Sequence, residues 1–242
     1  MTQLTLVIGN KNYSSWSLRP WLVLKQIGVD FNEVRIPLDT AQFRQEIFRY
    51  SPTGKVPVLQ HGNMTIWESI AICEYLVEQF PAAKLLPTEL AARALARSIS
   101  AEMHAGFQNL RQNMPMNCRS HFPGKGMKPG VQEDIDRITA IWRECREKFG
   151  NNNGDLLFGH FTIADAMFAP VVSRFITYGV KLDPISQDYA EAIRHLPSMQ
   201  AWITAAQVES EHLEQYDLQR RQETEDRRQE YPCINTGDWN ID

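Results

Sequence analysis

The chain has 242 residues, of which 43% are hydrophobic and 22% are charged, and its formal net charge at pH 7 is −4. This composition is ordinary for a globular protein, and the length allows one large domain or two small ones. The weak negative charge and the scattered basic residues exclude a field that would attract nucleic acid or an anionic membrane.

The four cysteines lie far apart, with neither a C-x-x-C pair nor a metal-ligand spacing (Cys73, Cys118, Cys145 and Cys233). Sparse cysteines are typical of free thiols in a reducing compartment, and this pattern predicts no metal site. The first residues lack a basic segment followed by an apolar run, and no apolar run reaches the roughly 18 residues of a membrane span. We therefore expect a cytoplasmic protein without membrane contact.

The first 80 residues alternate between strand and helix patterns. Residues 4–9 (LTLVIG) form a short β-branched run typical of a buried strand, and residues 17–28 form a helix pattern that ends at a glycine. Residues 31–38 read as a second strand, so this strand–helix–strand order predicts a parallel pair. Turn residues within 56–67 predict a hairpin, and residues 69–80 have apolar side chains at helical spacing.

The rest of the chain shows helix patterns only, at 90–114, 131–150, 161–179 and 196–210. After a proline-containing linker at 81–89, no convincing strand occurs up to residue 216. Thr162 and Asp165 match a helix capping box, in which an acid at the third helical position answers a threonine cap. Residues 217–242 have mixed charges and few apolar side chains, which predicts a polar tail.

Three serines crowd the turn between the first strand and the first helix (Ser14, Ser15 and Ser17). One serine is enough to cap exposed helix amides. Pro20 loses no intrahelical hydrogen bond only if the helix begins near Ser17, which would leave Ser14 and Ser15 in the turn with hydroxyls free to face a ligand. A helix N-terminus also favours anions, so the cluster fits either a cap or a site for a thiolate or phosphate.

Two later motifs also have two interpretations. Val56-Pro57 fits an edge-strand proline, or a cis bond that turns the Val56 backbone toward a peptide-like ligand. Glu68-Ser69 opens a helix, where it fits an ordinary cap, or a serine that holds a carboxylate beside an acid that holds an ammonium group.

These motifs together, in a βαβ–ββα order, resemble the glutathione transferase superfamily, and the resemblance covers nearly the whole chain. Residues 14–19 (SSWSLR) are similar to the S-S-C-x-x-R element of zeta-like transferases, which include maleylacetoacetate isomerases, and NYSSWSLRPW is similar to a segment of bacterial transferases. The resemblance implies a thioredoxin-like α/β domain at 1–82 and an all-helical domain at 88–216, followed by the tail at 217–242.

The resemblance also implies a role for the serines. Ser14 would stabilise the glutathione thiolate by a hydrogen bond, with Ser15 as the alternative donor. Trp16 replaces the cysteine of the zeta element, which weakens a redox or zeta-specific isomerase interpretation. Thr177 falls where zeta enzymes carry a substrate-binding arginine, and Arg174 could substitute only from a different face of the helix.

The remaining glutathione contacts implied by the resemblance come from the first domain. Val56 would pair its backbone with the cysteinyl part of glutathione across a cis bond to Pro57. Glu68 and Ser69 would hold the γ-glutamyl end, and Lys55 could reach the glycine carboxylate.

The electrophile would lie against the second domain. His104, Phe107 and Arg111 lie at helical spacing on a helix that lines the electrophile pocket in the superfamily, and Trp16 would also contact the electrophile. The alternative for this helix is ordinary packing around a satisfied histidine.

The resemblance implies a dimeric detoxification enzyme with glutathione as co-substrate. The bound thiolate would attack a small electrophilic, largely apolar substrate, without a metal. One alternative is a glutathione-dependent cis–trans isomerase of the maleylacetoacetate type. Another is a transferase-like binding protein without turnover. A thiol–disulfide oxidoreductase is disfavoured because the turn has no cysteine.

Overall fold

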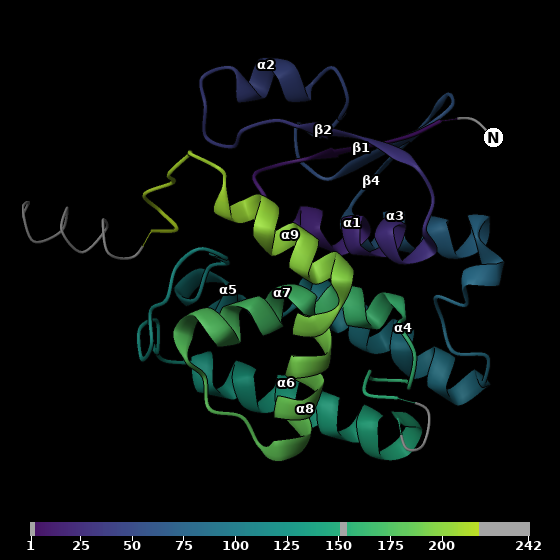
Figure 1. Ribbon diagram of the computed structural model, residues 1–242, viewed down its shortest axis with the longest axis vertical. Coiled ribbons are helices and arrows are strands. Elements are labelled where there is room, and N and C mark those ends of the chain that lie inside the picture. Colours follow the sequence, from purple (N-terminus) through teal and green to yellow (C-terminus); the bar gives the residue numbers. More distant parts are fainter. Residues whose placement is uncertain (1–2, 151–153, 218–242) are drawn as a thin grey trace, which may run out of the picture.

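The computed structural model describes residues 3–150 and 154–217, and it contains an α/β layer stacked on a helical layer (Figure 1). Of the predicted tail at 217–242, residues 218–242 lie outside the described residues. In chain order the α/β layer contains β1 (Leu4–Ile8), α1 (Ser15–Ile27), β2 (Phe31–Arg35), α2 (Phe43–Ile47), β3 (Val58–His61), β4 (Met64–Trp67) and α3 (Ser69–Gln79). A 3₁₀ turn (Pro81–Ala83) leads to α4 (Leu90–Ala105), α5 (Gln108–Asn113), α6 (Val131–Cys145), a π-helical turn (Arg146–Gly150), α7 (Ile163–Tyr178), α8 (Pro184–His195) and α9 (Pro197–Gln207).

The four strands form a single mixed sheet in the order β2-β1-β3-β4. The predicted parallel pair is β1 with β2, and the predicted hairpin is β3 with β4, which runs antiparallel. Leu6 of β1 packs in the main core with α1, whereas Val7 on the opposite face packs against Ile47 of α2. Because both faces of β1 are covered, its sequence is apolar at nearly every position.

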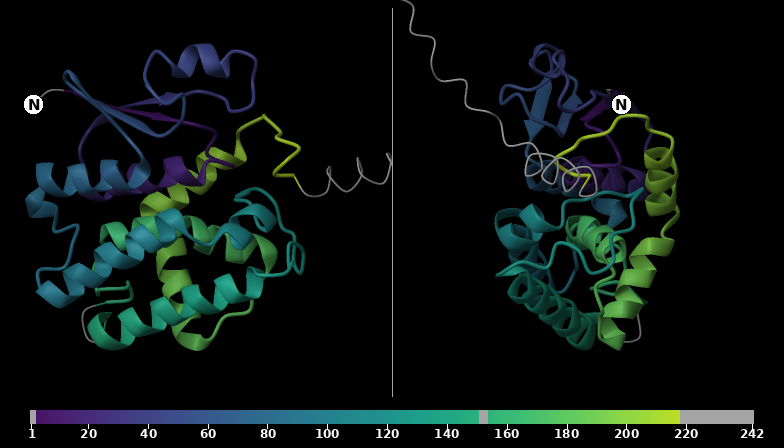
Figure 2. Two further views of the ribbon diagram at one scale, coloured as in Figure 1. Left: turned by 180° about the vertical axis from the view of Figure 1, so that it is seen from behind. Right: turned by 90° about the vertical axis from the view of Figure 1, so that its left-hand side faces the viewer.

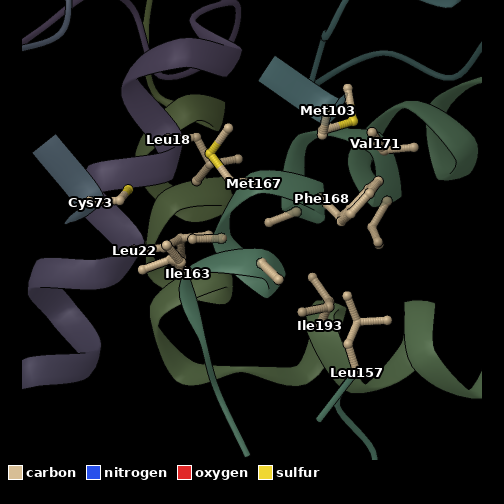
Figure 3. Close-up of a cluster of buried hydrophobic side chains, with 14 of the residues drawn as sticks. Leu18, Leu22, Cys73, Met103, Leu157, Ile163, Met167, Phe168, Val171 and Ile193 are labelled. Atoms are coloured by element: carbon tan, nitrogen blue, oxygen red, sulfur yellow. The ribbon is translucent and has the colours of Figure 1, made fainter. Parts of the chain in front are cut away.

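The main core joins the two layers. In Figure 3, Leu18 and Leu22 of α1 point toward Met167 and Ile163 of α7, and Cys73 of α3 lies on the same side as α1. All five side chains are buried, and α7 itself has buried residues on every face. A helix that is apolar all round belongs in the interior, and here it supports the helix that carries the serine cluster.

Helix α1 begins earlier than its sequence pattern predicts. Ser14 is its N-cap and Ser15 its first helical residue, so the expected start near Ser17 is wrong. Pro20 therefore lies inside the helix, and the carbonyl of Trp16 lacks its usual amide donor. The other end agrees with the expectation, since Gly28 forms the C-cap with a φ of 78°.

The second layer is helical, as predicted, with two differences in detail. The pattern that begins at Leu90 forms two helices, because the chain turns at Gly106 and Phe107, and Phe107 has a φ of 60°. Helix α8 was not among the expected helices. The predicted capping box is present: Asp165 accepts a hydrogen bond of 2.8 Å from the amide of Thr162.

Helices long and apolar enough to cross a membrane do not occur among residues 3–150 and 154–217.

Candidate active site

Two adjoining cavities lie beside the N-terminus of α1. The first has a volume of about 320 Å³ and is bounded by both layers, because its lining includes Ser14, Ser15, Leu38, Phe43, Met116, Arg111, Arg174 and Tyr216. The second has a volume of about 160 Å³ and is lined by Trp16, Thr53, Lys55, Val56, Pro57, Trp67, Glu68 and Ser69. Trp16, Lys55 and Val56 line both cavities, so the two form one continuous site.

A larger cavity of about 700 Å³ lies elsewhere, where Leu4, Phe31 and Phe80 are among its lining residues. None of the residues predicted to act in the site lines it. The convergence of the predicted residues, rather than cavity size, therefore locates the candidate active site.

Ser14 caps helix α1. Its oxygen accepts a hydrogen bond from the amide of Ser17, at 3.4 Å, and its hydroxyl donates to the Ser17 oxygen at 2.7 Å. The Ser17 oxygen also accepts from the amide of Gly9 at 3.2 Å, which joins the helix start to the end of β1. The Ser14 proton thus already has an acceptor within the protein, although its side chain lines the first cavity.

Ser15 is linked to the second layer instead. Its oxygen accepts a hydrogen bond from Arg174 Nη2 at 3.2 Å. Among the described residues no acceptor is recorded for the Ser15 proton, so this hydroxyl is available to donate into the cavity that Ser15 and Arg174 both line. The other guanidinium nitrogens of Arg174 donate to the carbonyls of Met114 and Pro170, at 2.9 and 3.2 Å, which fixes the side chain.

The ring of Trp16 contacts two guanidinium groups. The Arg19 guanidinium lies 4.3 Å from a ring centroid of Trp16, and that of Arg111 lies 4.7 Å away. Arg111 also donates to the carbonyls of Gly106, His104 and Met103, which ties the turn between α4 and α5 to the site. These cation–π contacts hold Trp16 as a wall that both cavities share.

Arg111 and Arg174 line the first cavity and give the site a positive charge, and the buried Arg19 lies beside Ser69 of the second cavity. Burial lowers the pKa of Arg174 to about 10 and that of Arg111 to about 10, and burial together with these two cations lowers the pKa of Arg19. In the part of the chain that the structure describes, none of the three forms an ion pair with a carboxylate. Guanidinium groups stay protonated at neutral pH, so their positive charge favours the binding of an anion in the site.

Arg19 is fully buried, and two of its nitrogens, Nε and Nη2, have no hydrogen-bond partner within the protein. Its Nη1 donates to Ser69 Oγ at 3.4 Å. Leaving buried donors unpaired costs free energy. Arg19 lines neither cavity, so it reaches the site only through Ser69 and the ring of Trp16.

The Val56–Pro57 peptide bond is cis, as one of the two interpretations of this motif expects. Val56 lies just before β3, and its side chain lines both cavities together with that of Lys55. The Lys55 amide donates to Ser51 Oγ at 3.3 Å, which fixes the loop that leads into the site.

Glu68 and Ser69 meet the second cavity at the N-terminus of α3. Glu68 has a φ of 68°, a backbone conformation that costs free energy and is common at ligand sites. Its carboxylate lies 3.5 Å from His104 Nε2. Burial, followed by the charge of Arg19, lowers the pKa of His104, so His104 is neutral at pH 7 and this contact is no ion pair there.

Three other candidate residues lie outside the cavities. Phe107 is buried in the main core, and Thr177 is buried with its hydroxyl donating to carbonyls of Asn117 and Ser173. His104 lines neither cavity, although its ring contacts that of Trp16 at 5.2 Å between centroids. Of the two residues considered for the zeta arginine position, Arg174 faces the site.

Two aromatic residues of the site carry no signal in the local sequence. Tyr13 and Tyr216 both line the first cavity, and their rings stack with centroids 5.6 Å apart. They lie at opposite ends of the chain, so spacing along the sequence could not associate them.

Comparison with protein families gives two matches. Residues 13–79 match the model "Glutathione S-transferase, N-terminal domain", and residues 106–205 match "Glutathione S-transferase, C-terminal domain". The chain belongs to the glutathione S-transferase family. It is therefore a glutathione transferase, and the resemblance to the zeta-like members and the predicted fold class are both confirmed.

Curated relatives place this glutathione transferase near the zeta class. It is 32% identical to the maleylacetoacetate isomerase of Mus musculus, a match that covers 70% of this chain and 77% of that protein. It is 26% identical to the zeta class glutathione S-transferase of Euphorbia esula, over 81% of this chain and 89% of the relative.

Solved structures have the same fold. A glutathione transferase homolog from Burkholderia, solved with bound glutathione, is 28% identical and superimposes with a TM-score of 0.63, covering 84% of this transferase and 97% of that chain. A glutathione S-transferase from the clam Laternula elliptica has a TM-score of 0.67 at 23% identity, covering 87% and 96% of the two chains.

Proposed function

We propose that this glutathione transferase binds glutathione across the two adjoining cavities and activates its thiol with Ser15 and Arg174. The hydrogen bond from Arg174 to Ser15 carries the proposal. Because the Ser15 oxygen is already an acceptor, its proton is left for the sulfur, whereas Ser14 donates its proton to Ser17. Ser15 is therefore the preferred donor, in place of the Ser14 that family likeness favours.

The magnitudes support this assignment. A thiol of pKa about 8.5 must fall by about two units to be mostly thiolate at pH 7, which requires about 2.7 kcal/mol. A hydroxyl that donates to an anion contributes about 1.5–3 kcal/mol, and the N-terminus of α1 adds about 0.3–1 kcal/mol. The positive charge of Arg174 acts in the same direction, so a general base is not required.

Glutathione would extend from the first cavity into the second. Its cysteinyl part would pair with the backbone of Val56 before the cis bond to Pro57. The γ-glutamyl end would lie at the N-terminus of α3, with its carboxylate on Ser69 and its ammonium group on Glu68. Lys55, on the edge of both cavities, would attract the glycine carboxylate.

The thiolate assignment is tested by titrating the ultraviolet absorbance of thiolate in bound glutathione. In Ser15→Ala the pKa of the bound thiol should rise by about one unit or more, since one unit equals about 1.36 kcal/mol. Ser14→Ala should shift it less. A larger shift in Ser14→Ala would return the role to Ser14, and no shift in either variant would contradict the serine mechanism.

The second substrate would lie in the first cavity and would carry an anionic group as well as an apolar part. Arg111 and Arg174 line this cavity without a carboxylate partner among the described residues, beside apolar Met116 and Leu38. Trp16 and Arg111, two of the residues predicted to contact the electrophile, line this cavity. Phe107 and His104 do not line it and could influence the electrophile only through neighbouring residues.

A glutathione-dependent cis–trans isomerase is the second candidate function. The same two arginines favour it, because a maleyl-type substrate carries carboxylates, and relatives at 30–32% identity are named maleylacetoacetate isomerases. Steady-state assays of isomerisation and of aryl halide conjugation on one preparation separate the functions. Turnover of aryl halides alone would exclude the isomerase.

We also propose that residues 1–82 and 88–216 form two domains, with the site at the junction between them. We also propose a cytoplasmic homodimer with a role in detoxification, which rests on family likeness. Light scattering coupled to gel filtration tests the dimer.

A further inference from the structure

The segment after α9 runs along the junction between the two layers. Figure 2 shows this yellow-green segment, residues 208–217, between the α/β layer and the helical layer, and we call it the C-terminal strap. It is bound to the first layer by Glu209, whose carboxylate accepts hydrogen bonds from the amides of Lys11 and Asn12 at 2.7 and 3.0 Å. These amides lie in the turn that leads to Ser14 and Ser15.

The strap is bound to the second layer by Arg119, which precedes α6. Its guanidinium donates to the carbonyl of Glu211 at 2.6 Å and also to that of Glu209. It donates in addition to the hydroxyl of Tyr13 at 3.0 Å. Residues from both layers therefore fix the path of the strap.

A buried carboxylate fixes the end of the strap. Asp217 is 7% exposed. It accepts hydrogen bonds from the Tyr13 hydroxyl at 3.1 Å and from Asn117 Nδ2 at 2.7 Å, and His212 Nδ1 lies 3.2 Å from its second oxygen. A buried carboxylate with several donors is held in one position, because losing any donor leaves charge unsatisfied.

The neighbouring Tyr216 faces the site. Its ring stacks on that of Tyr13 at 5.6 Å and lines the first cavity together with Ser15 and Arg174. Its backbone carbonyl accepts a hydrogen bond from Asn117 Nδ2 at 3.4 Å. The strap thus contributes an aromatic side chain to the lining of the first cavity, whose other lining residues lie much earlier in the chain.

We propose that Tyr216 determines specificity for the second substrate, as a wall that selects flat, unsaturated groups on the sulfur of glutathione, and that Asp217 is a positioning residue that holds this wall. The proposal rests on the assignment of the first cavity to the second substrate. An aromatic wall favours such groups because ring pairs gain stabilisation beyond the area they bury.

The test measures binding of three ligands to the full chain by calorimetry: glutathione, S-methylglutathione and S-benzylglutathione. In Tyr216→Ala, the affinity for S-benzylglutathione should fall about fivefold, while the other two affinities change less than about twofold. Tyr216→Phe keeps the ring and should restore the ratio of S-benzyl to S-methyl affinity. Glu214→Ala, in the same strap but exposed and absent from the cavity lining, is the matched control and should leave all three affinities unchanged.

Asp217→Ala should reduce the same ratio to a similar extent, and the double variant Tyr216→Ala/Asp217→Ala should reduce it no further, because the two act through one wall. If Asp217→Ala does not fold, Tyr13→Phe is the second variant. It keeps the ring and removes the hydroxyl that donates to Asp217 and accepts from Arg119, and it should also lower the ratio. An unchanged ratio in Tyr216→Ala, or an equal loss for all three ligands, would overturn the specificity role. Failure of the wild type to bind glutathione would instead overturn the proposed function, and the wall with it.

Discussion

Arg174 Nη2 donates a hydrogen bond of 3.2 Å to Ser15 Oγ, and this contact joins residues that are 159 positions apart. Ser15 is the first residue of α1 in the α/β layer, whereas Arg174 belongs to α7 in the helical layer. The contact places a buried cation behind the hydroxyl that we propose as the thiolate donor. Activation of the thiol should therefore depend on both layers.

Replacing Arg174 with Gln should raise the pKa of bound glutathione by about one unit or more, because an opposite charge a few ångströms from a thiolate favours its ionised form. Turnover near neutral pH should fall about tenfold and recover at higher pH. The pH dependence of kcat/KM measures this shift. Arg97→Gln is the control, since Arg97 is exposed in a surface ion pair with Glu74. A profile that falls equally at every pH would contradict the role of Arg174.

Replacing Ser14 with Ala should act mainly on stability. The cap loses its bonds to Ser17, and the free energy of unfolding should decrease by about 1 kcal/mol. Urea denaturation of Ser14→Ala and Ser15→Ala compares the two positions, and the larger loss should occur in Ser14→Ala. Equal stability of Ser14→Ala and the wild type would show that the cap is unimportant.

Replacing Glu68 with Ala should weaken glutathione binding by about 1.5 kcal/mol or more, the low end for a hydrogen bond to a charged group. Glu68 is half exposed in the second cavity, so its removal should leave the fold intact. Calorimetry measures the affinity, with Glu74→Ala as the matched control on the same helix. Unchanged affinity in a folded Glu68→Ala protein would refute its contact with the γ-glutamyl end.

Replacing Arg19 with Met should increase the stability of the ligand-free protein, or leave it unchanged, and should weaken glutathione binding. The buried guanidinium has two unpaired nitrogens and cationic neighbours, and an apolar side chain of similar volume removes that cost. We expect the free energy of unfolding to increase by about 0–2 kcal/mol and the affinity for glutathione to fall about fivefold. Thermal unfolding with and without glutathione measures both effects. Lower stability without ligand would show that the charge is structural.

The contribution of Asp165 to the free energy of unfolding should decrease as the pH rises from about 4 to 6. Burial raises the pKa of Asp165 from 3.8 to about 6. The folded state therefore binds more protons than the unfolded state in this range, and the contribution is at most about 1.4 kcal/mol per pH unit. Urea unfolding of the wild type and of Asp165→Asn at several pH values measures it. An equal pH dependence in both proteins would contradict the assignment.

Local patterns in the sequence predicted most of the architecture. Alternation, apolar runs, Gly28 and the capping box at Thr162 and Asp165 act over a few residues, and the strands, the parallel pair and the helical second layer follow from them. Family likeness predicted that Lys55, Val56, Glu68 and Ser69 contact glutathione, which stays a proposal, and the structure brings these four residues to one cavity.

The local pattern failed where tertiary contacts decide. Helix α1 begins at Ser15 rather than near Ser17. Ser14 hydrogen-bonds with Ser17, and the Ser17 oxygen also accepts a hydrogen bond from the amide of Gly9 at the end of β1. Phe107 has helical spacing but takes a positive φ and turns into the core, away from the cavity. Helix periodicity cannot anticipate a turn that side chains from other helices stabilise.

The sequence by itself determined the strands, most of the helices and the serine turn, because hydrogen bonds and hydrophobic spacing within short segments set these features. Motif likeness identified the family. Only the tertiary structure decided which serine keeps a free proton, which of Arg174 and Thr177 faces the site, and that Tyr216 meets Tyr13. The contacts of Ser15 with Arg174 and of Tyr13 with the C-terminal strap join residues more than 150 positions apart along the chain, and they depend on how α7 and the strap pack against α1. Spacing along the sequence carries no information about such packing.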